Sequence, residues 1–259
     1  MNRLPVSLPL ITDPWFYAVA VPAVLLMGLG KSGFASGFGS LAVPLMALTI
    51  SVPQAAAIML PLLLVMDATG LQQLWHDRDR AMVRRLLGFG LLGVVIGWAL
   101  FGLLSARTVA AVVGALTLLF LAQRLLFPPK RGGPDGHSAP LWVGRVCAVT
   151  SGFTSFVAHA GGPPINAYLL PQRMDPRVLS ATLAVFFAAV NAAKWLPYAA
   201  LGLIDLRNMA TALVLMPLAP LGVWLGVRLT RYVSVTWFYR LAYTGMFLTG
   251  SKLLHDGLR

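Results

Sequence analysis

The residues that could do chemistry gather in two glycine-rich stretches between apolar runs. The first, from Gly28 to Gly39, contains five glycines and Lys31. The second runs from Ser151 to Pro164 and contains His159. Glycine and proline interrupt helices, and a bilayer tolerates open backbone only where protein or a water-filled cavity surrounds it. Two interruptions in matching positions of a chain point to a transporter's binding site.

A helix that starts after such a break points unpaired N–H groups and a positive dipole end at the break. Two starts, at Ser36–Gly39 and His159–Pro163, would together cradle an anion, and nearby hydroxyls would donate further hydrogen bonds. The alternative is that the small residues only let helices pack closely. The candidate binding residues are Lys31, Ser32, Gly33, Ser36, Gly37, Gly39, Ser151, Gly152, Ser155, His159, Gly161, Gly162, Pro163 and Asn166.

Ionisable side chains within apolar segments are costly unless they face water, a partner or a bound ion. For Lys31 the sequence leaves two interpretations, an anion contact or a side chain that extends to the membrane interface. His159 could donate to an anion, carry a proton or bond a neighbouring carbonyl. Asp67 and Lys194 lie in counterpart spans, where they could couple transport to protons, pair structurally or simply lie near a span end.

Other chemistries lack their residue patterns. Gly30-Lys31-Ser32 resembles the end of a nucleotide-binding P-loop, but Leu25 stands where that motif needs glycine. The four histidines have no ligand-like spacing and Cys147 is the single cysteine, so the sequence predicts no metal site. No nucleophile–base–acid arrangement and no dinucleotide-binding fingerprint can be identified. We therefore expect neither an enzyme nor a bound cofactor.

Composition indicates the class of protein. The 259 residues are 58% hydrophobic and 11% charged, whereas soluble domains carry roughly 25% charged residues. Uncharged runs such as Leu86–Ala106 and Asn208–Val227 are long enough to cross a bilayer core. The net charge is +12, but the basic residues lie mostly at the ends of apolar runs. There they orient a membrane protein, so we expect no nucleic-acid binding.

The predicted elements are helices that cross the bilayer. Residues 15–50 are apolar apart from Lys31, and one helix of that length would run about 54 Å against a core of roughly 30 Å. A re-entrant hairpin of two short helices fits better, and residues 141–170 form a second broken segment. A proline- and glycine-rich linker at 128–140 separates a first repeat at 1–127 from a second at 141–259. Plain spans are expected near 54–74, 86–104, 107–126, 178–200, 208–227 and 236–254.

Matching spacings indicate that the two halves repeat. Pro44 and Pro163 each lie eleven residues after the glycine of a Ser-Gly-Phe string. The arginine-rich loop 75–85 has a weakly basic counterpart near 202–207, while the next pair of loops shows the reverse. Because the basic side swaps between the halves, we expect inverted repeats with both termini outside. A parallel arrangement of eight plain crossings stays open.

At these motifs the chain resembles the TauE/SafE family of sulfite exporters, also called the toluene-sulfonate uptake permease group, over nearly its whole length. The resemblance lies in a first segment that ends in Leu41-Ala42-Val43-Pro44-Leu45 and in Ser151-Gly152-Phe153 followed by Gly161-Gly162-Pro163-Pro164. The first segment departs from the common form, because Gly37-Phe38-Gly39-Ser40 replaces consecutive glycines. The resemblance implies a bacterial inner-membrane secondary transporter for sulfite or small organosulfonates, which family members often export.

We therefore expect an all-α polytopic membrane protein that exports a small sulfur-containing anion by alternating access around a mid-membrane site. The expected partners are the anionic substrate and the lipid bilayer, and a homodimer is left open. A passive anion channel is the first alternative, and sustained single-channel currents would identify it. A membrane assembly factor without transport activity is the second, and it would bind no sulfur anion.

Overall fold

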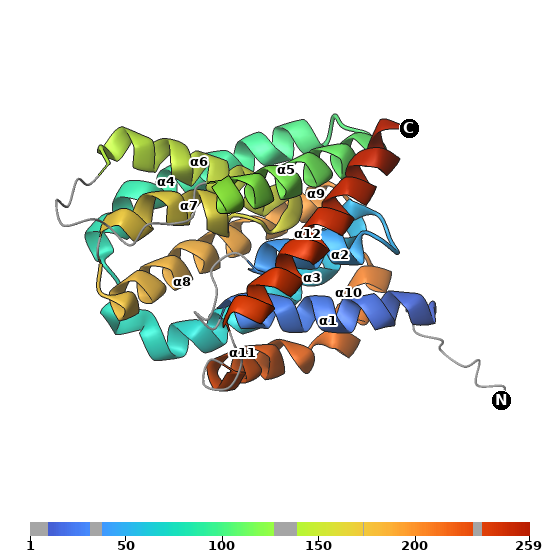
Figure 1. Ribbon diagram of the computed structural model, residues 1–259, viewed down its shortest axis with the longest axis horizontal. Coiled ribbons are helices and arrows are strands. Elements are labelled where there is room, and N and C mark those ends of the chain that lie inside the picture. The colour runs from blue at the N-terminus through green and yellow to red at the C-terminus, as the bar shows by residue number, and fades with distance from the viewer. Residues whose placement is uncertain (1–9, 32–37, 127–138, 173, 230–234) are drawn as a thin grey trace.

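The computed structural model describes residues 10–31, 38–126, 139–172, 174–229 and 235–259, and within these ranges the chain is helical and contains no strand (Figure 1). The prediction of an all-α protein is confirmed. The elements in chain order are α1 Pro14–Lys31, η1 Phe38–Leu41, α2 Ala42–Met46, α3 Val52–Leu74, η2 Trp75–Asp77, α4 Arg80–Phe101, α5 Ala106–Leu126, α6 Leu141–Ala158, α7 Gly162–Leu169, η3 Leu170–Gln172, α8 Pro176–Ala193, α9 Trp195–Ala200, α10 Leu206–Leu215, α11 Leu218–Leu229 and α12 Val235–Leu258.

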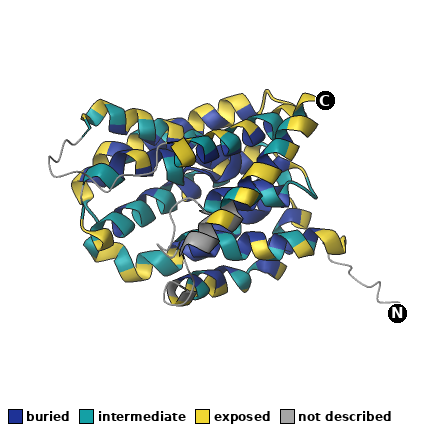
Figure 2. Ribbon diagram, in the orientation of Figure 1, coloured by how far each residue is buried: buried dark blue, intermediate teal, exposed yellow. Residues whose placement is uncertain are grey.

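Within the described ranges, six helical segments are long and apolar enough to cross a membrane, and α10 with α11 forms a bent seventh. Large apolar side chains cover the outside of this bundle, among them Leu103 at 82% exposure and Trp142 at 65%. Figure 2 shows exposed residues on the outer faces of the helices and buried residues toward the interior. Such an apolar exterior suits lipid rather than water. The chain is a multi-pass membrane protein.

Aspartates at the ends of loops set where several helices begin. Asp79 precedes α4 and its carboxylate accepts hydrogen bonds from two N–H groups of the first turn. Asp175 and Asp205 cap α8 and α10 in the same way. A carboxylate at this position satisfies N–H groups that have no partner inside the helix and interacts favourably with the helix dipole. Three of the chain's eight acidic residues thus lie at helix starts.

Both glycine-rich segments break the helix, as predicted, and in both the chain turns back. Helix α1 ends at Lys31, and after the undescribed residues 32–37 the segment η1 returns beside α1, so that a Cβ on Gly39 would lie 2.7 Å from Met27 Sδ. Helix α6 ends at Ala158, and α7 runs back along it until a Cβ on Gly144 would meet the ring of Tyr168. We call α1 with η1 and α2 the first hairpin, and α6 with α7 the second.

The predicted span at 208–227 corresponds to two helices with a bend between them. Helices α10 and α11 meet at Met216–Pro217 with a bend of 43°. Proline has no N–H to donate to the preceding turn and its ring collides with that turn, so it kinks a helix. The remaining plain spans coincide with α3, α4, α5, α8 with α9, and α12 to within a few residues.

Close helix crossings at glycine hold the two hairpins against the bundle. On α4, Gly93 faces the backbone of α6 at Val149, and a Cβ there would overlap the Val149 carbonyl oxygen. On α11, Gly222 packs against Gly28 of α1. A Cβ added to Gly28 would lie 2.6 Å from the Gly222 carbonyl carbon. Glycine at these positions lets the helix backbones approach closely. The repeat boundaries, the linker and the inverted relation of the halves stay predictions.

The α4–α6 crossing can be tested with one methyl group. We expect Gly93→Ala to lower the melting temperature of the purified protein in detergent, because the methyl group must push two backbones apart at a cost of roughly 1–3 kcal/mol. Gly88→Ala on the same helix is the matched control, since an added Cβ there meets nothing within 4 Å. Equal melting temperatures for the two variants would contradict the crossing.

Candidate functional site

An ion pair joins the end of the first hairpin's long helix to α3. Lys31 Nζ, at the last residue of α1, donates to Asp67 Oδ1 at 2.5 Å. The lysine side chain is 21% exposed and the aspartate side chain 3%. The Phe187 ring lies 5.2 Å from the same Nζ, within the range of a cation–π contact. Lys31 is therefore the accessible member of the pair and Asp67 the enclosed one.

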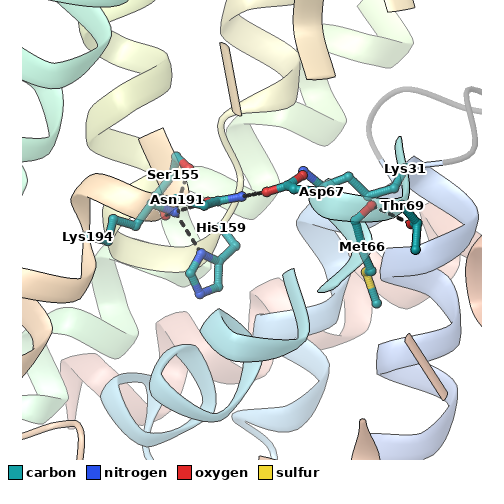
Figure 3. Close-up of polar contacts among 8 residues, drawn as sticks. All are labelled: Lys31, Met66, Asp67, Thr69, Ser155, His159, Asn191 and Lys194. Atoms are coloured by element: carbon teal, nitrogen blue, oxygen red, sulfur yellow. Dashed lines mark hydrogen bonds and ion pairs between the residues drawn. The ribbon is translucent and has the colours of Figure 1, made fainter. Parts of the chain in front are cut away.

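Asn191 of α8 extends this pair toward the second hairpin. Its Nδ2 donates to Asp67 Oδ2 at 2.6 Å, and its Oδ1 accepts from Lys194 Nζ at 2.8 Å. Because a carboxylate only accepts and an ammonium only donates, these two neighbours fix which way the amide points. Figure 3 shows Lys31, Asp67, Asn191 and Lys194 lying in one row across the interior.

Lys194 is fully buried and surrounded by acceptors. Besides Asn191, its Nζ contacts the carbonyl oxygen and Oγ of Ser155, both at 2.8 Å, and His159 Nδ1 at 2.9 Å. Ser155 and His159 lie at the end of α6, so Lys194 holds the tip of the second hairpin. The row of contacts thus runs without interruption from one hairpin to the other (Figure 3).

His159 is the residue at which the second hairpin turns. It has a left-handed backbone with φ 52° at the C-terminal cap of α6, a conformation that few residues other than glycine adopt. Its ring Nε2 lies 2.9 Å from the carbonyl oxygen of Ala56 on α3, and its Nδ1 faces Lys194. Of the three roles that the sequence left open, the structure supports the bond to a neighbouring carbonyl. That bond and the lysine contact hold the turn in place.

A cavity of about 680 Å³ opens beside this row, between the two hairpins, α3 and α8. Within the part of the chain that the structure describes, Lys31, Asp67 and His159 are the ionisable residues in its wall. Ser155, Asn166 and Asn191 add polar groups, and methionine, leucine and Phe187 supply much of the remaining surface. A mostly apolar cavity with a few converging polar groups is typical of a small-molecule site.

Asn166 of α7 brings an unsatisfied polar atom to this cavity. The residue is 6% exposed, and Oδ1 has no hydrogen-bond partner among the described residues. Buried polar atoms without a partner are uncommon, so one that borders a cavity points to a bound molecule or water.

The start of α7 offers fewer main-chain N–H donors than its position beside the cavity suggests. Pro163 and Pro164 have no N–H, so of the four positions that begin the helix only Gly161 and Gly162 carry a donor.

Three of the predicted binding residues hold the second hairpin together or pack it against α4 instead of lining the cavity. Ser151 Oγ donates to the Gly161 carbonyl oxygen at 2.6 Å, which joins α6 to the start of α7. Gly152 packs against the backbone of α4 at Gly90, and Gly161 against Ser151 and Phe187. These contacts agree with the alternative that small residues allow close packing.

The other predicted residues divide between the cavity and the undescribed part of the chain. Ser32, Gly33, Ser36 and Gly37 lie outside the described residues. The cavity wall contains Lys31, Gly39, Ser155, His159, Gly162, Pro163, Asn166 and Asp67, and Lys194 lies directly behind it. Sequence reasoning missed Asn191 and Phe187. Asn191 had a usable signal, since it is a polar residue within an apolar span three positions before Lys194 and therefore on the same helix face.

Comparison with known families decides which proteins this chain belongs with. A family model described as sulfite exporter TauE/SafE matches residues 20–253. The chain belongs to the TauE/SafE family. The resemblance inferred from the glycine-rich motifs is therefore confirmed over nearly the whole length. TauE/SafE proteins are a family of membrane transporters for sulfite and related sulfur anions. No curated protein and no solved structure matches the chain.

The Lys31–Asp67 pair can be measured with a double-mutant cycle. We expect Lys31→Met and Asp67→Asn each to lower the melting temperature, and the double variant to lose less than the sum of the two. The reason is that each single change leaves Asp67 or Lys31 without its direct ionic partner, whereas the double change removes both members of the pair. A coupling free energy of about 1–3 kcal/mol from unfolding in detergent is the expected result. Strict additivity would mean that the two side chains do not interact.

Proposed function

We propose that this protein exports sulfite or a small organosulfonate across the bacterial inner membrane, and that the anion binds in the cavity between the two hairpins. The single observation that carries the proposal is Lys31, a partly exposed ammonium group in the wall of a largely apolar cavity, in a chain of the TauE/SafE family. An ammonium group facing a largely apolar cavity attracts an anion more strongly than one facing bulk water.

The neighbours of Lys31 suit an oxyanion. Ser155 Oγ and the Asn166 amide line the same cavity and can donate to the oxygens of the anion. Phe187 and the methionines around them can cover its apolar part, such as the carbon chain of a sulfonate. In this proposal the anion takes over part of the hydrogen bonding of Lys31 from Asp67. The pair seen between Lys31 and Asp67 is then the arrangement without substrate.

Alternating access would proceed by movement of the two hairpins relative to each other. The first hairpin reaches the site through Lys31 and the second through His159 and Ser155. Hydrogen bonds tie the first hairpin to α3, and the second to α3 and to Lys194 at the end of α8. Helix α1 packs on α11, and α6 packs on α4. If the halves are inverted repeats, these two pairs are equivalent, and exchanging their conformations would turn an inward-facing cavity into an outward-facing one.

Transport can be tested with purified protein in liposomes. We expect Lys31→Met to lower the rate of sulfite efflux by about tenfold to a hundredfold. A hydrogen bond to a charged group contributes about 1.5–3 kcal/mol, and each 1.4 kcal/mol corresponds to roughly tenfold in affinity. Lys252→Met is the matched control, because Lys252 is exposed and pairs with Asp256 one helical turn away.

Unchanged flux in Lys31→Met would contradict the assigned site. The same liposomes separate a carrier from a channel, since a carrier exchanges labelled for unlabelled sulfite with saturation whereas a channel passes sustained current. Absence of any sulfite flux, together with no thermal shift by sulfur anions, would favour an assembly factor and contradict the proposed function as a whole.

The arrangement of the halves predicts the side on which the chain ends. Helix α1 begins and α12 ends on the right of Figure 1. If the hairpins do not cross the membrane and the halves are inverted, the C-terminus lies outside the cytoplasm. A reporter that is active only outside the cytoplasm should then be active when it is fused after Arg259. The same reporter fused within the linker 128–140 is the control and should be inactive, because the linker is then cytoplasmic. A cytoplasmic C-terminus would favour eight plain crossings.

A further inference from the structure

We propose that the anion bound in the cavity carries a single negative charge, so that the site discriminates by charge between monoanions and dianions. The inference deepens the proposed function and rests on it. It comes from counting the charges in the row of hydrogen-bonded residues that joins the two hairpins. The count depends on the protonation of Lys194, His159, Asp67 and Lys31, which the geometry of their contacts determines.

The contacts of Lys194 are those of an ammonium group. The Ser155 carbonyl oxygen accepts and cannot donate. Asn191 Oδ1 also accepts, because the Nδ2 of the same amide is committed to Asp67. His159 Nδ1 is the third such atom, since it carries a lone pair whenever Nε2 carries the proton. Three obligatory acceptors at 2.8–2.9 Å match the three hydrogens of an ammonium, whereas a neutral amine would leave one acceptor facing a lone pair.

His159 is neutral in this arrangement. Its Nε2 lies 2.9 Å from the Ala56 carbonyl oxygen, so Nε2 must carry a hydrogen. Its Nδ1 faces the Lys194 ammonium, so Nδ1 must accept. Asp67 accepts from Lys31 at one oxygen and from Asn191 at the other, as an ionised carboxylate does. Lys31 donates to that carboxylate and is the second ammonium.

Two ammonium groups and one carboxylate give the row one net positive charge. In the described part of the chain, no other charged side chain lines the cavity. A net charge enclosed by apolar helices is costly, and a bound counter-charge of one unit removes that cost. A dianion would leave one negative charge in excess and would lose more hydration on entry.

For sulfite the consequence is a choice between two forms that coexist near neutral pH. The site should take hydrogensulfite, which is a monoanion, in preference to the dianion. Sulfonates remain monoanions over this pH range, so they should bind as hydrogensulfite does. Sulfate, a dianion of similar size, should be excluded because of its charge. The residues that decide this are Lys31, Asp67 and Lys194, with His159 as a neutral member.

The test compares methanesulfonate with sulfate on the purified wild-type protein. Both anions compete against labelled sulfite for uptake into proteoliposomes, at matched ionic strength because salt screens charge interactions. We expect methanesulfonate to compete at a concentration at least about tenfold lower than sulfate. Equal competition by the two anions would overturn the inference. This test requires only the wild-type protein.

Asp67→Asn then changes the charge count without changing the shape of the side chain. The row gains a second net positive charge, so sulfate should improve relative to methanesulfonate by roughly tenfold or more. Asp256→Asn is the matched control, since Asp256 lies at the surface in a pair with Lys252 and should leave the ratio unchanged.

The outcomes separate this inference from the proposed function. If wild-type protein transports sulfite and loses flux in Lys31→Met, but Asp67→Asn leaves the sulfate-to-methanesulfonate ratio unchanged, the charge inference fails and the function stands. If wild-type protein neither binds nor transports any sulfur anion, both fail. If Asp67→Asn does not fold, the wild-type competition alone decides.

Discussion

The compensation of charge inside an apolar bundle is the constraint on which the rest of this structure depends. Asp67 is enclosed, so it requires donors at both oxygens, and it finds them in Lys31 and Asn191. Asn191 can serve only because Lys194 holds its other end. Removing one partner would leave a buried charge or acceptor without the hydrogen bond that compensates it. The row therefore fixes four helices relative to one another and at the same time leaves one positive charge beside the cavity.

Glycine makes this arrangement possible by allowing the hairpins to lie against the bundle at backbone distance. At the Gly28–Gly222 and Gly93–Val149 crossings, no side chain separates the helices. Larger residues would move the hairpin tips outward, and the lysine and histidine contacts are only 2.5–2.9 Å long. Hydrogen bonds weaken steeply as donor and acceptor move apart, so an outward movement of the hairpin tips would break these contacts. Packing far from the site and charge compensation at the site thus depend on each other.

In the proposed site, side chains rather than the main chain supply most of the groups that could bind an anion. The glycine-rich breaks suggested that free N–H groups at two helix starts would hold the substrate. In the second hairpin, Pro163 and Pro164 remove two of the four donors at the start of α7. The conformation that breaks the helix is instead used to bring Lys31, His159 and Asn166 to one cavity. The breaks act mainly as a means of placing side chains in the interior.

The sequence by itself determined the membrane class, the positions of the helices and the two interruptions, because these follow from local hydrophobicity and from glycine and proline. It also marked Lys31, Asp67, His159 and Lys194 as costly residues that need partners. Only the tertiary structure decided which residues are the hydrogen-bond and ion-pair partners of these four. Lys31 and Asp67 are 36 positions apart, and Asn191 lies 124 positions beyond Asp67. No local pattern encodes a contact at that separation, since it depends on how helices cross and how the hairpins turn.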